Sequence, residues 1–112
     1  MPADIVDFSA KTNATIVFTF ASHAGGFAYL SGASLTDETT QKYTPLVVTS
    51  NSVTFPLPAG ESFVQFAIVD GPRPETGALS YTVNGGASTV LWPDDATRPL
   101  AGMPGAFYGY GN

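Results

Sequence analysis

The sequence predicts an all-β protein, a single-domain antiparallel β-sandwich of the immunoglobulin-like or jelly-roll type with about seven or eight strands. Three observations predict it. Apolar and polar residues alternate in short runs, turn-forming Gly, Pro and Asn residues separate the runs, and no stretch has the spacing and caps of an amphipathic helix. The chain has 112 residues, which is the length of one domain.

The first three expected strands are residues 4–9, 14–21 and 26–30. In the second, Ile16, Phe18 and Phe20 fall on one face and mostly threonines fall on the other. This pattern is typical of a strand with one buried face. The third strand is shorter and places Phe27 and Tyr29 on the same side.

The next three expected strands are residues 43–50, 52–57 and 62–69. Pro45 and Pro56 cannot donate a hydrogen bond to a neighbouring strand. We therefore expect the strand with Pro45 to lie at a sheet edge or to begin after the proline, and the strand with Pro56 to lie at an edge. Residues 62–69 are apolar on both faces, and we expect a central strand that is covered on both sides. The expected core includes Phe18, Val64, Phe66 and Ile68.

The last two expected strands, 78–83 and 87–92, flank Asn84, Gly85 and Gly86. Asn and Gly tolerate the positive φ that tight hairpin turns need, so this sequence predicts a hairpin. We expect the sandwich to occupy residues 1–92.

Residues 93–112 lack strand periodicity, and we expect them to form an irregular C-terminal arm of the same domain. From residue 99 to the end there is no charged side chain, and Phe107, Tyr108 and Tyr110 lie among glycines and prolines. A disordered end would leave these aromatic side chains in water, which favours aggregation. The remaining alternatives are a flap over the domain's own sheet and an arm that contacts a neighbouring protein. We favour the contact arm, with the three aromatic residues as anchors.

The composition excludes several classes of partner. Charged residues make up 12% of the chain, about half the usual share, and the net charge is −5. The four basic residues form no cluster, so we expect neither nucleic acid nor an anionic membrane as a partner. The chain has no cysteine, and residues 1–10 do not have the pattern of a secretory signal. We expect a location inside the cell, export without a signal peptide, or the surface of a virion or other particle.

The sequence shows no constellation for catalysis. His23 is the only histidine, and it follows Ser22 directly, whereas neighbours along a strand point to opposite faces. The carboxylates include adjacent pairs, which tend to diverge instead of flanking a substrate, and no alternating Asp pattern predicts a calcium loop. We therefore expect no catalytic residue, no cofactor and no metal site, unless distant loops converge on calcium.

Trp92, Asp94 and Asp95 are the strongest candidates for recognition. A tryptophan face stacks on the apolar face of a sugar, and carboxylates accept hydrogen bonds from its hydroxyls. Tyr108 and Tyr110 could join such a site. The alternative, more common in small β domains, is that Trp92 closes the core and that Pro-Asp-Asp forms the following turn.

In size and composition the chain looks like a phage capsid-decoration protein or another virion accessory protein, although no family motif matches residue by residue. This resemblance implies a non-enzymatic structural subunit of an ordered assembly, in contact with a protein partner or with copies of itself. A lectin-like module that binds a glycan is the alternative.

Overall fold

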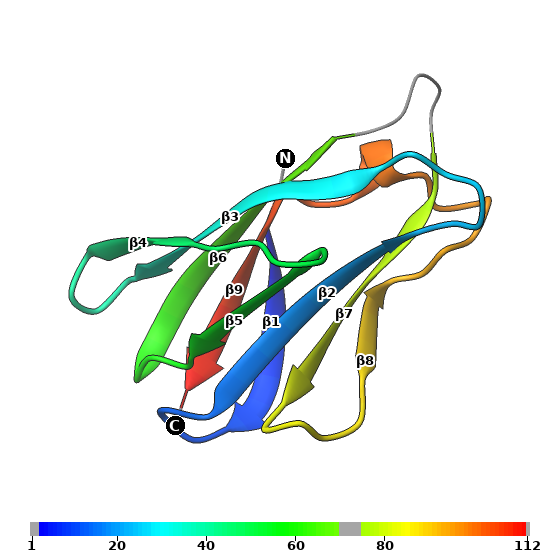
Figure 1. Cartoon of the computed structure of the whole chain (residues 1–112). Coiled ribbons are helices and arrows are strands. Elements are labelled where there is room, and N and C mark those ends of the chain that lie inside the picture. Colours follow the sequence, from blue (N-terminus) through cyan, green and yellow to red (C-terminus); the bar gives the residue numbers. More distant parts are fainter. Residues whose placement is uncertain (1–2, 70–74, 112) are drawn as a thin grey trace.

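The computed structural model describes the backbone of residues 3–69 and 75–111, and the side chains from residue 11 onward within these ranges. Nine strands of this part of the chain form two sheets that pack face to face (Figure 1). The five-stranded sheet contains, in spatial order, β1 (Ala3–Ala10), β9 (Ala106–Gly111), β6 (Gly60–Val69), β3 (Tyr29–Asp37) and β4 (Lys42–Leu46). The four-stranded sheet contains β5 (Ser52–Pro56), β2 (Thr15–Ser22), β7 (Gly77–Val83) and β8 (Thr89–Trp92).

The all-β sandwich predicted from the sequence is confirmed. The paired strands run antiparallel except β1 and β9, which are parallel. The helical element described is the short 3-10 helix η1 (Leu100–Gly102). No helix of the described residues is long and apolar enough to cross a membrane. The choice between the immunoglobulin-like and jelly-roll types stays a prediction.

The core lies between the two sheets and is built around Phe18 of β2. The Phe18 ring is fully buried, and its centroid lies 5.0 Å from that of Phe66, 5.7 Å from Tyr81 and 6.0 Å from Phe55. These rings come from both sheets, so burial of aromatic surface holds the two layers together. Phe18, Val64 and Phe66 are buried as expected, and Ile68 is partly buried against them.

Strand β6 occupies the centre of the five-stranded sheet, between β3 and β9, as its sequence predicts. The expectation that both of its faces are covered is wrong. Gln65, Ala67 and Val69 point away from the core and are exposed. The described chain builds only two layers, and a two-layer sandwich leaves the outer face of each sheet bare.

The two proline-containing strands are edge strands. β4, with Pro45, is the last strand of the five-stranded sheet, and β5, with Pro56, is the last strand of the four-stranded sheet. A proline at an edge removes a donor that has no partner there.

The hairpin at Asn84 and Gly85 is also confirmed. Both residues have positive φ, 51° and 72°, and the N–H of Gly86 donates to the Val83 carbonyl at 2.9 Å. This is the geometry of a type I′ turn. The Asn84 side-chain oxygen also accepts from the N–H of Thr15 at 2.8 Å, which ties the turn to β2.

The irregular arm predicted for residues 93–112 is wrong for Ala106–Gly111. These residues form β9, drawn in red in Figure 1, which lies between β1 and β6. Glycines that suggested flexibility instead permit close packing, because a Cβ added at Gly111 would overlap the Pro58 carbonyl oxygen. The sandwich therefore does not end at Trp92, and its strands extend to residue 111.

Candidate functional site

The outer face of the five-stranded sheet carries most of the exposed aromatic side chains of the described residues. We call this surface the aromatic face. Its large side chains are Tyr29, Tyr43, Phe63, Val69, Tyr108 and Tyr110. The strand register places them together, since Tyr43 pairs with Thr36, Thr36 with Phe63, and Phe63 with Tyr108. Residues paired across neighbouring strands point to the same side of a sheet.

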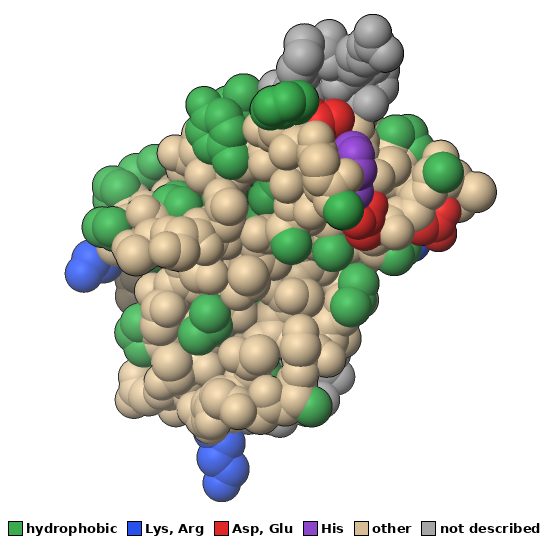
Figure 2. Space-filling view, turned by 45° about the vertical axis from the view of Figure 1, so that its right-hand side comes forward, with side chains coloured by type: hydrophobic (Ala, Val, Ile, Leu, Met, Phe, Trp, Pro, Cys, Tyr) green, Lys and Arg blue, Asp and Glu red, His purple; other side chains and the backbone are tan. Residues whose placement is uncertain are grey.

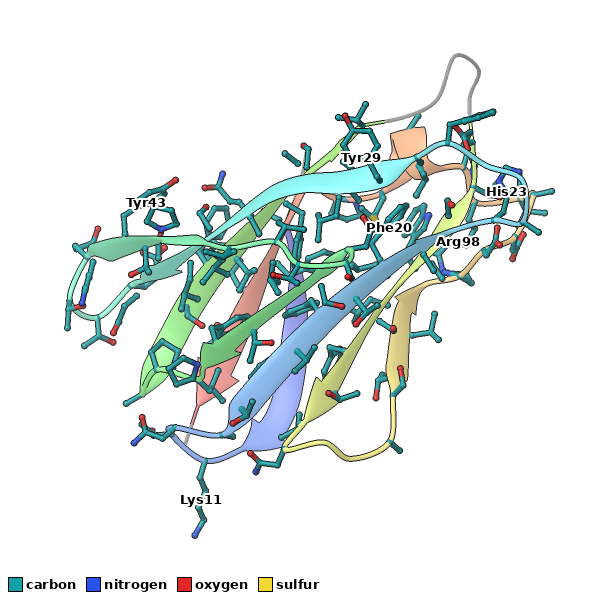
Figure 3. The ribbon with its side chains drawn as sticks, viewed as in Figure 1. Lys11, Phe20, His23, Tyr29, Tyr43 and Arg98 are labelled. Atoms are coloured by element: carbon teal, nitrogen blue, oxygen red, sulfur yellow. The ribbon has the colours of Figure 1, made fainter. Side chains whose placement is uncertain are left out.

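The aromatic face is open to solvent in the single chain. Tyr43 is 61% exposed, Tyr29 49% and Tyr110 43%. Figure 3 shows Tyr29 on β3 and Tyr43 on β4, both directed away from the interior of the sandwich. The rings of Phe63 and Tyr108 pack on each other with centroids 4.8 Å apart, so these two side chains form one continuous aromatic surface.

This face carries few charged residues. Among its residues from position 11 onward, whose side chains the structure describes, Glu61 is the one charged residue. In the backbone register Asp7 of β1 also pairs with Tyr110. The other charged groups lie elsewhere: Lys11 projects from one end of the sandwich, and Arg98 lies at the opposite end with His23 (Figure 3). Figure 2 shows acidic side chains gathered beside the histidine at that end.

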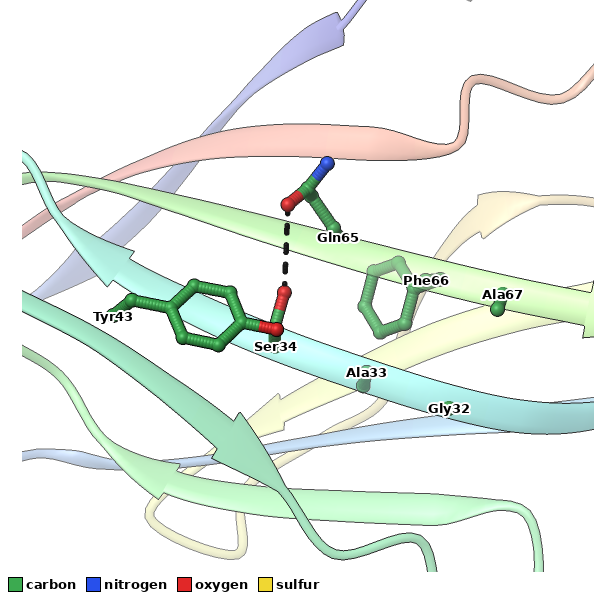
Figure 4. Close-up of a pocket in the computed structure, with 7 residues that line it drawn as sticks. All are labelled: Gly32, Ala33, Ser34, Tyr43, Gln65, Phe66 and Ala67. Carbon is green, nitrogen blue, oxygen red and sulfur yellow. Dashed lines mark hydrogen bonds between the residues drawn. The ribbon is translucent and has the colours of Figure 1, made fainter.

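A hollow of about 400 Å³ lies in the aromatic face over β3, β4 and β6 (Figure 4). It is lined by Gly32, Ala33, Ser34, Tyr43, Gln65, Phe66 and Ala67. The hollow exists because small residues meet there: Gly32 pairs with Ala67, next to a β-bulge between Leu30 and Gly32. The Ser34 hydroxyl donates to the Gln65 side-chain oxygen at 3.5 Å.

A second hollow of about 400 Å³ opens between the β4 and β5 edges of the two sheets. Its lining includes the apolar residues Leu35, Leu46, Phe55 and Leu57, together with Asp37 and Lys42. Leu57 and Phe55 are already buried in the core. This hollow is the open side of the sandwich, and it presents less aromatic surface than the aromatic face.

The outer face of the four-stranded sheet is different in character. Its described residues are mostly small or β-branched: Thr15, Val17, Thr19, Ala21, Ser52, Thr54, Pro56, Ala78, Ser80, Thr82 and Val90. The hydroxyl oxygens of Thr19 and Ser52 lie 3.0 Å apart and hydrogen-bond to each other. The outer faces of the two sheets thus differ in their aromatic content.

The structure does not arrange Trp92, Asp94 and Asp95 as a sugar platform. Trp92 is only 8% exposed, its indole N–H donates to the Arg98 carbonyl at 3.1 Å, and the Arg98 guanidinium lies 4.1 Å from the ring centroid. A sugar could stack on that ring face only by displacing Arg98. The alternative in which Trp92 closes the core agrees with this burial.

The two carboxylates after Trp92 hold local structure. Asp94 accepts a hydrogen bond from the Thr76 hydroxyl at 2.7 Å. Asp95 accepts from the Thr97 hydroxyl at 2.5 Å and from the Thr97 N–H at 2.7 Å. These two hydrogen bonds, with a smaller contribution from the Arg98 charge, lower the pKa of Asp95.

The three tail aromatics have separate positions. Phe107 faces the core, is 3% exposed, and lies 6.0 Å from Phe66 between ring centroids. Its predicted role as an anchor for a partner is therefore wrong, because β9 is an interior strand whose alternate residues face the core. Tyr108 and Tyr110 point to the aromatic face and remain candidates for contact.

The only histidine makes a backbone contact. His23 Nδ1 lies 3.2 Å from the Thr76 carbonyl oxygen, which can only accept, so Nδ1 carries the proton. No group of three or more His, Cys, Asp or Glu residues that could hold a metal occurs within residues 3–69 and 75–111.

Glu75 is a structural residue that the sequence pattern does not reveal. It is buried, and its Oε1 accepts from the N–H groups of Phe27 at 2.6 Å and Ala28 at 3.3 Å. Gly26 leaves room for this carboxylate, since a Cβ there would lie 2.5 Å from Oε1. Because these partners are nearly fifty residues apart in sequence, no local motif could have predicted the contact.

Comparisons with known proteins add no assignment. A scan against protein-family models, a search of curated proteins and a search of solved structures each found no match to this chain.

Proposed function

We propose that the protein is a non-enzymatic structural subunit that assembles with copies of itself through the aromatic face. The observation that supports this is a largely aromatic surface with few charged residues, on which Tyr29, Tyr43 and Tyr110 are exposed on three different strands. Tyrosine is enriched at protein interfaces because it combines apolar area with a polar tip. The specific form of this proposal is an accessory or decoration subunit of a virion or other particle.

The distribution of charge agrees with association through this face. A net charge of −5 makes copies of the chain repel each other at long range. Glu61 is the one charged residue of the aromatic face whose side chain the structure describes, and Asp7 pairs with Tyr110 in the backbone register. Contact through this face therefore places few like charges together. Added salt should therefore strengthen association, because it screens the long-range repulsion and leaves apolar burial intact.

Sedimentation velocity over a range of protein concentrations tests the proposal. We expect the wild type to associate, and we expect the double variant Tyr43→Ser/Tyr110→Ser to associate at least about tenfold more weakly, since each lost ring is worth on the order of 1 kcal/mol or more. Val90→Ser is the matched control, because Val90 is 57% exposed on the other sheet. It should associate like the wild type.

Thermal melting of each variant as a monomer separates loss of assembly from loss of folding. A wild type that stays monomeric at every concentration would contradict the proposal. So would a Val90→Ser variant that loses association as strongly as the tyrosine double variant.

A further inference from the structure

We propose that the hollow over β3, β4 and β6 binds one sugar ring of a neutral glycan. This site is distinct from the Trp92 region, and the inference goes beyond self-assembly and does not depend on it. A pyranose ring has one apolar face of C–H groups and a rim of hydroxyls that both donate and accept. The lining of the hollow offers a partner for each of these parts.

The polar groups of the hollow are uncharged and of both kinds. Ser34 contributes a hydroxyl, Gln65 an amide with two donors and one acceptor oxygen, and Tyr43 a phenol hydroxyl. The Ser34–Gln65 hydrogen bond is long, at 3.5 Å, so a sugar hydroxyl could replace it at little cost. Figure 4 shows the Tyr43 ring beside Ser34 at one end of the hollow.

The apolar part of the lining is matched to a flat ligand. Gly32 and Ala67 pair across β3 and β6 and leave a low floor between larger side chains. The Tyr43 ring is exposed, and it stacks on no other aromatic ring of the described residues. One face of the ring is therefore available to the C–H groups of a sugar. A volume of about 400 Å³ lies within the usual range for small-ligand sites, about 300–1,000 Å³.

Other ligand classes fit the hollow less well. An anionic ligand would meet no cationic side chain in the lining and a protein of net charge −5. A purely apolar ligand would cover the Gln65 amide N–H groups without accepting their hydrogen bonds, which is unfavourable. An added peptide strand would have to pair at the β4 edge, where Pro45 lacks a donor.

The test is a titration of dilute, isotopically labelled protein followed by NMR of the backbone amides. The probes are the methyl glycosides of glucose, galactose, mannose and N-acetylglucosamine, their linear tetrasaccharides, and glucuronic acid as an anionic comparison. At least one neutral probe should shift the signals of Gly32, Ser34, Gln65 and Ala67, with a dissociation constant on the order of 1 mM or tighter. Glucuronic acid should bind more weakly than glucose.

Two variants act on the hollow in different ways. Gly32→Val fills the floor, and the added Cβ itself meets only the Ala67 Cβ at 3.9 Å, an ordinary contact. Tyr43→Ala removes the aromatic face. Each should weaken binding of the responding probe at least about tenfold, whereas Val90→Ser, on the other sheet, should leave it unchanged.

The proposal is overturned if no neutral probe shifts any signal, if the shifts centre on Trp92, or if Gly32→Val binds as tightly as the wild type. Because the measurement uses monomeric protein, a failure of self-assembly leaves its outcome unaffected, and the two proposals can fail separately.

Discussion

At the scale of single residues, several polar side chains of the described chain hydrogen-bond to the backbone. Asn84 and Asp95 each accept from a backbone N–H, and His23 contacts a backbone carbonyl. Such contacts hold turns in place, which is the ordinary use of Asn and Asp in loops. Glu75 does the same across a long sequence separation. These polar residues therefore position loops, and the candidate surface is made by tyrosines.

The Asp95–Thr97 turn yields a prediction about pH. We expect the pKa of Asp95 to lie below its ordinary value of 3.8, because Thr97 donates to the ionised carboxylate. A depressed pKa means that the turn stabilises the folded state above about pH 3.8 and loses that contribution as the pH falls through the folded-state pKa. The contribution is small, since the carboxylate is exposed.

Carbon-detected NMR of the Asp95 carboxyl measures this pKa directly. Thr97→Ala should raise it, and Thr97→Ser, which keeps the hydroxyl, should not. A wild-type pKa of 3.8 or higher, or no response to Thr97→Ala, would show that the turn does not form in solution.

At the scale of the elements, β9 is the segment whose structure differs most from the sequence-based expectation. It pairs with β6 over six residues and with β1 on its other side, so a segment without obvious strand periodicity lies inside the larger sheet. The two faces of β9 have different environments: Phe107 packs in the core, and Tyr108 and Tyr110 lie on the aromatic face. β9 thus couples the stability of the domain to the proposed contact surface.

The different environments of these residues predict different losses in the free energy of unfolding when each is replaced by alanine. Phe107→Ala should lower the free energy of unfolding by roughly 3–5 kcal/mol, the usual range for a buried phenylalanine. Tyr110→Ala, at an exposed position of the same strand, should cost less than about 1 kcal/mol. Urea denaturation of both variants as monomers provides the comparison. Equal small losses would mean that the tail is not an interior strand.

The elements show what the sequence could predict and where local patterns were insufficient. The alternation around Phe18, the prolines of the edge strands and the Asn84-Gly85 turn are local signals, and each predicted its element correctly. β9 was missed because Gly109 and Gly111 interrupt the apolar alternation, and the close packing of Gly111 against Pro58 is visible only in the structure. The hollow depends on Gly32 meeting Ala67 across two strands, and such long-range pairing leaves no local signal.

At the scale of the whole molecule, the two sheets share one core but present different outer faces. The four-stranded sheet shows mostly threonine, serine and small apolar residues, whereas the five-stranded sheet shows tyrosines around a neutral hollow. Lys11 and Arg98 lie at opposite ends of the sandwich (Figure 3). This asymmetry supports the proposal that the molecule associates through the aromatic face, which is the central claim of the proposed function.

Hydroxyl-radical footprinting with residue-level mass spectrometry tests this claim most directly, because it compares side-chain accessibility in the monomer and in the associated protein. The account predicts that Tyr29, Tyr43 and Tyr110 are modified readily at low concentration and become protected on association. Val90, exposed on the other sheet, should be modified equally in both states. Unchanged modification of the three tyrosines in the associated protein, or protection centred on Val90, would contradict it.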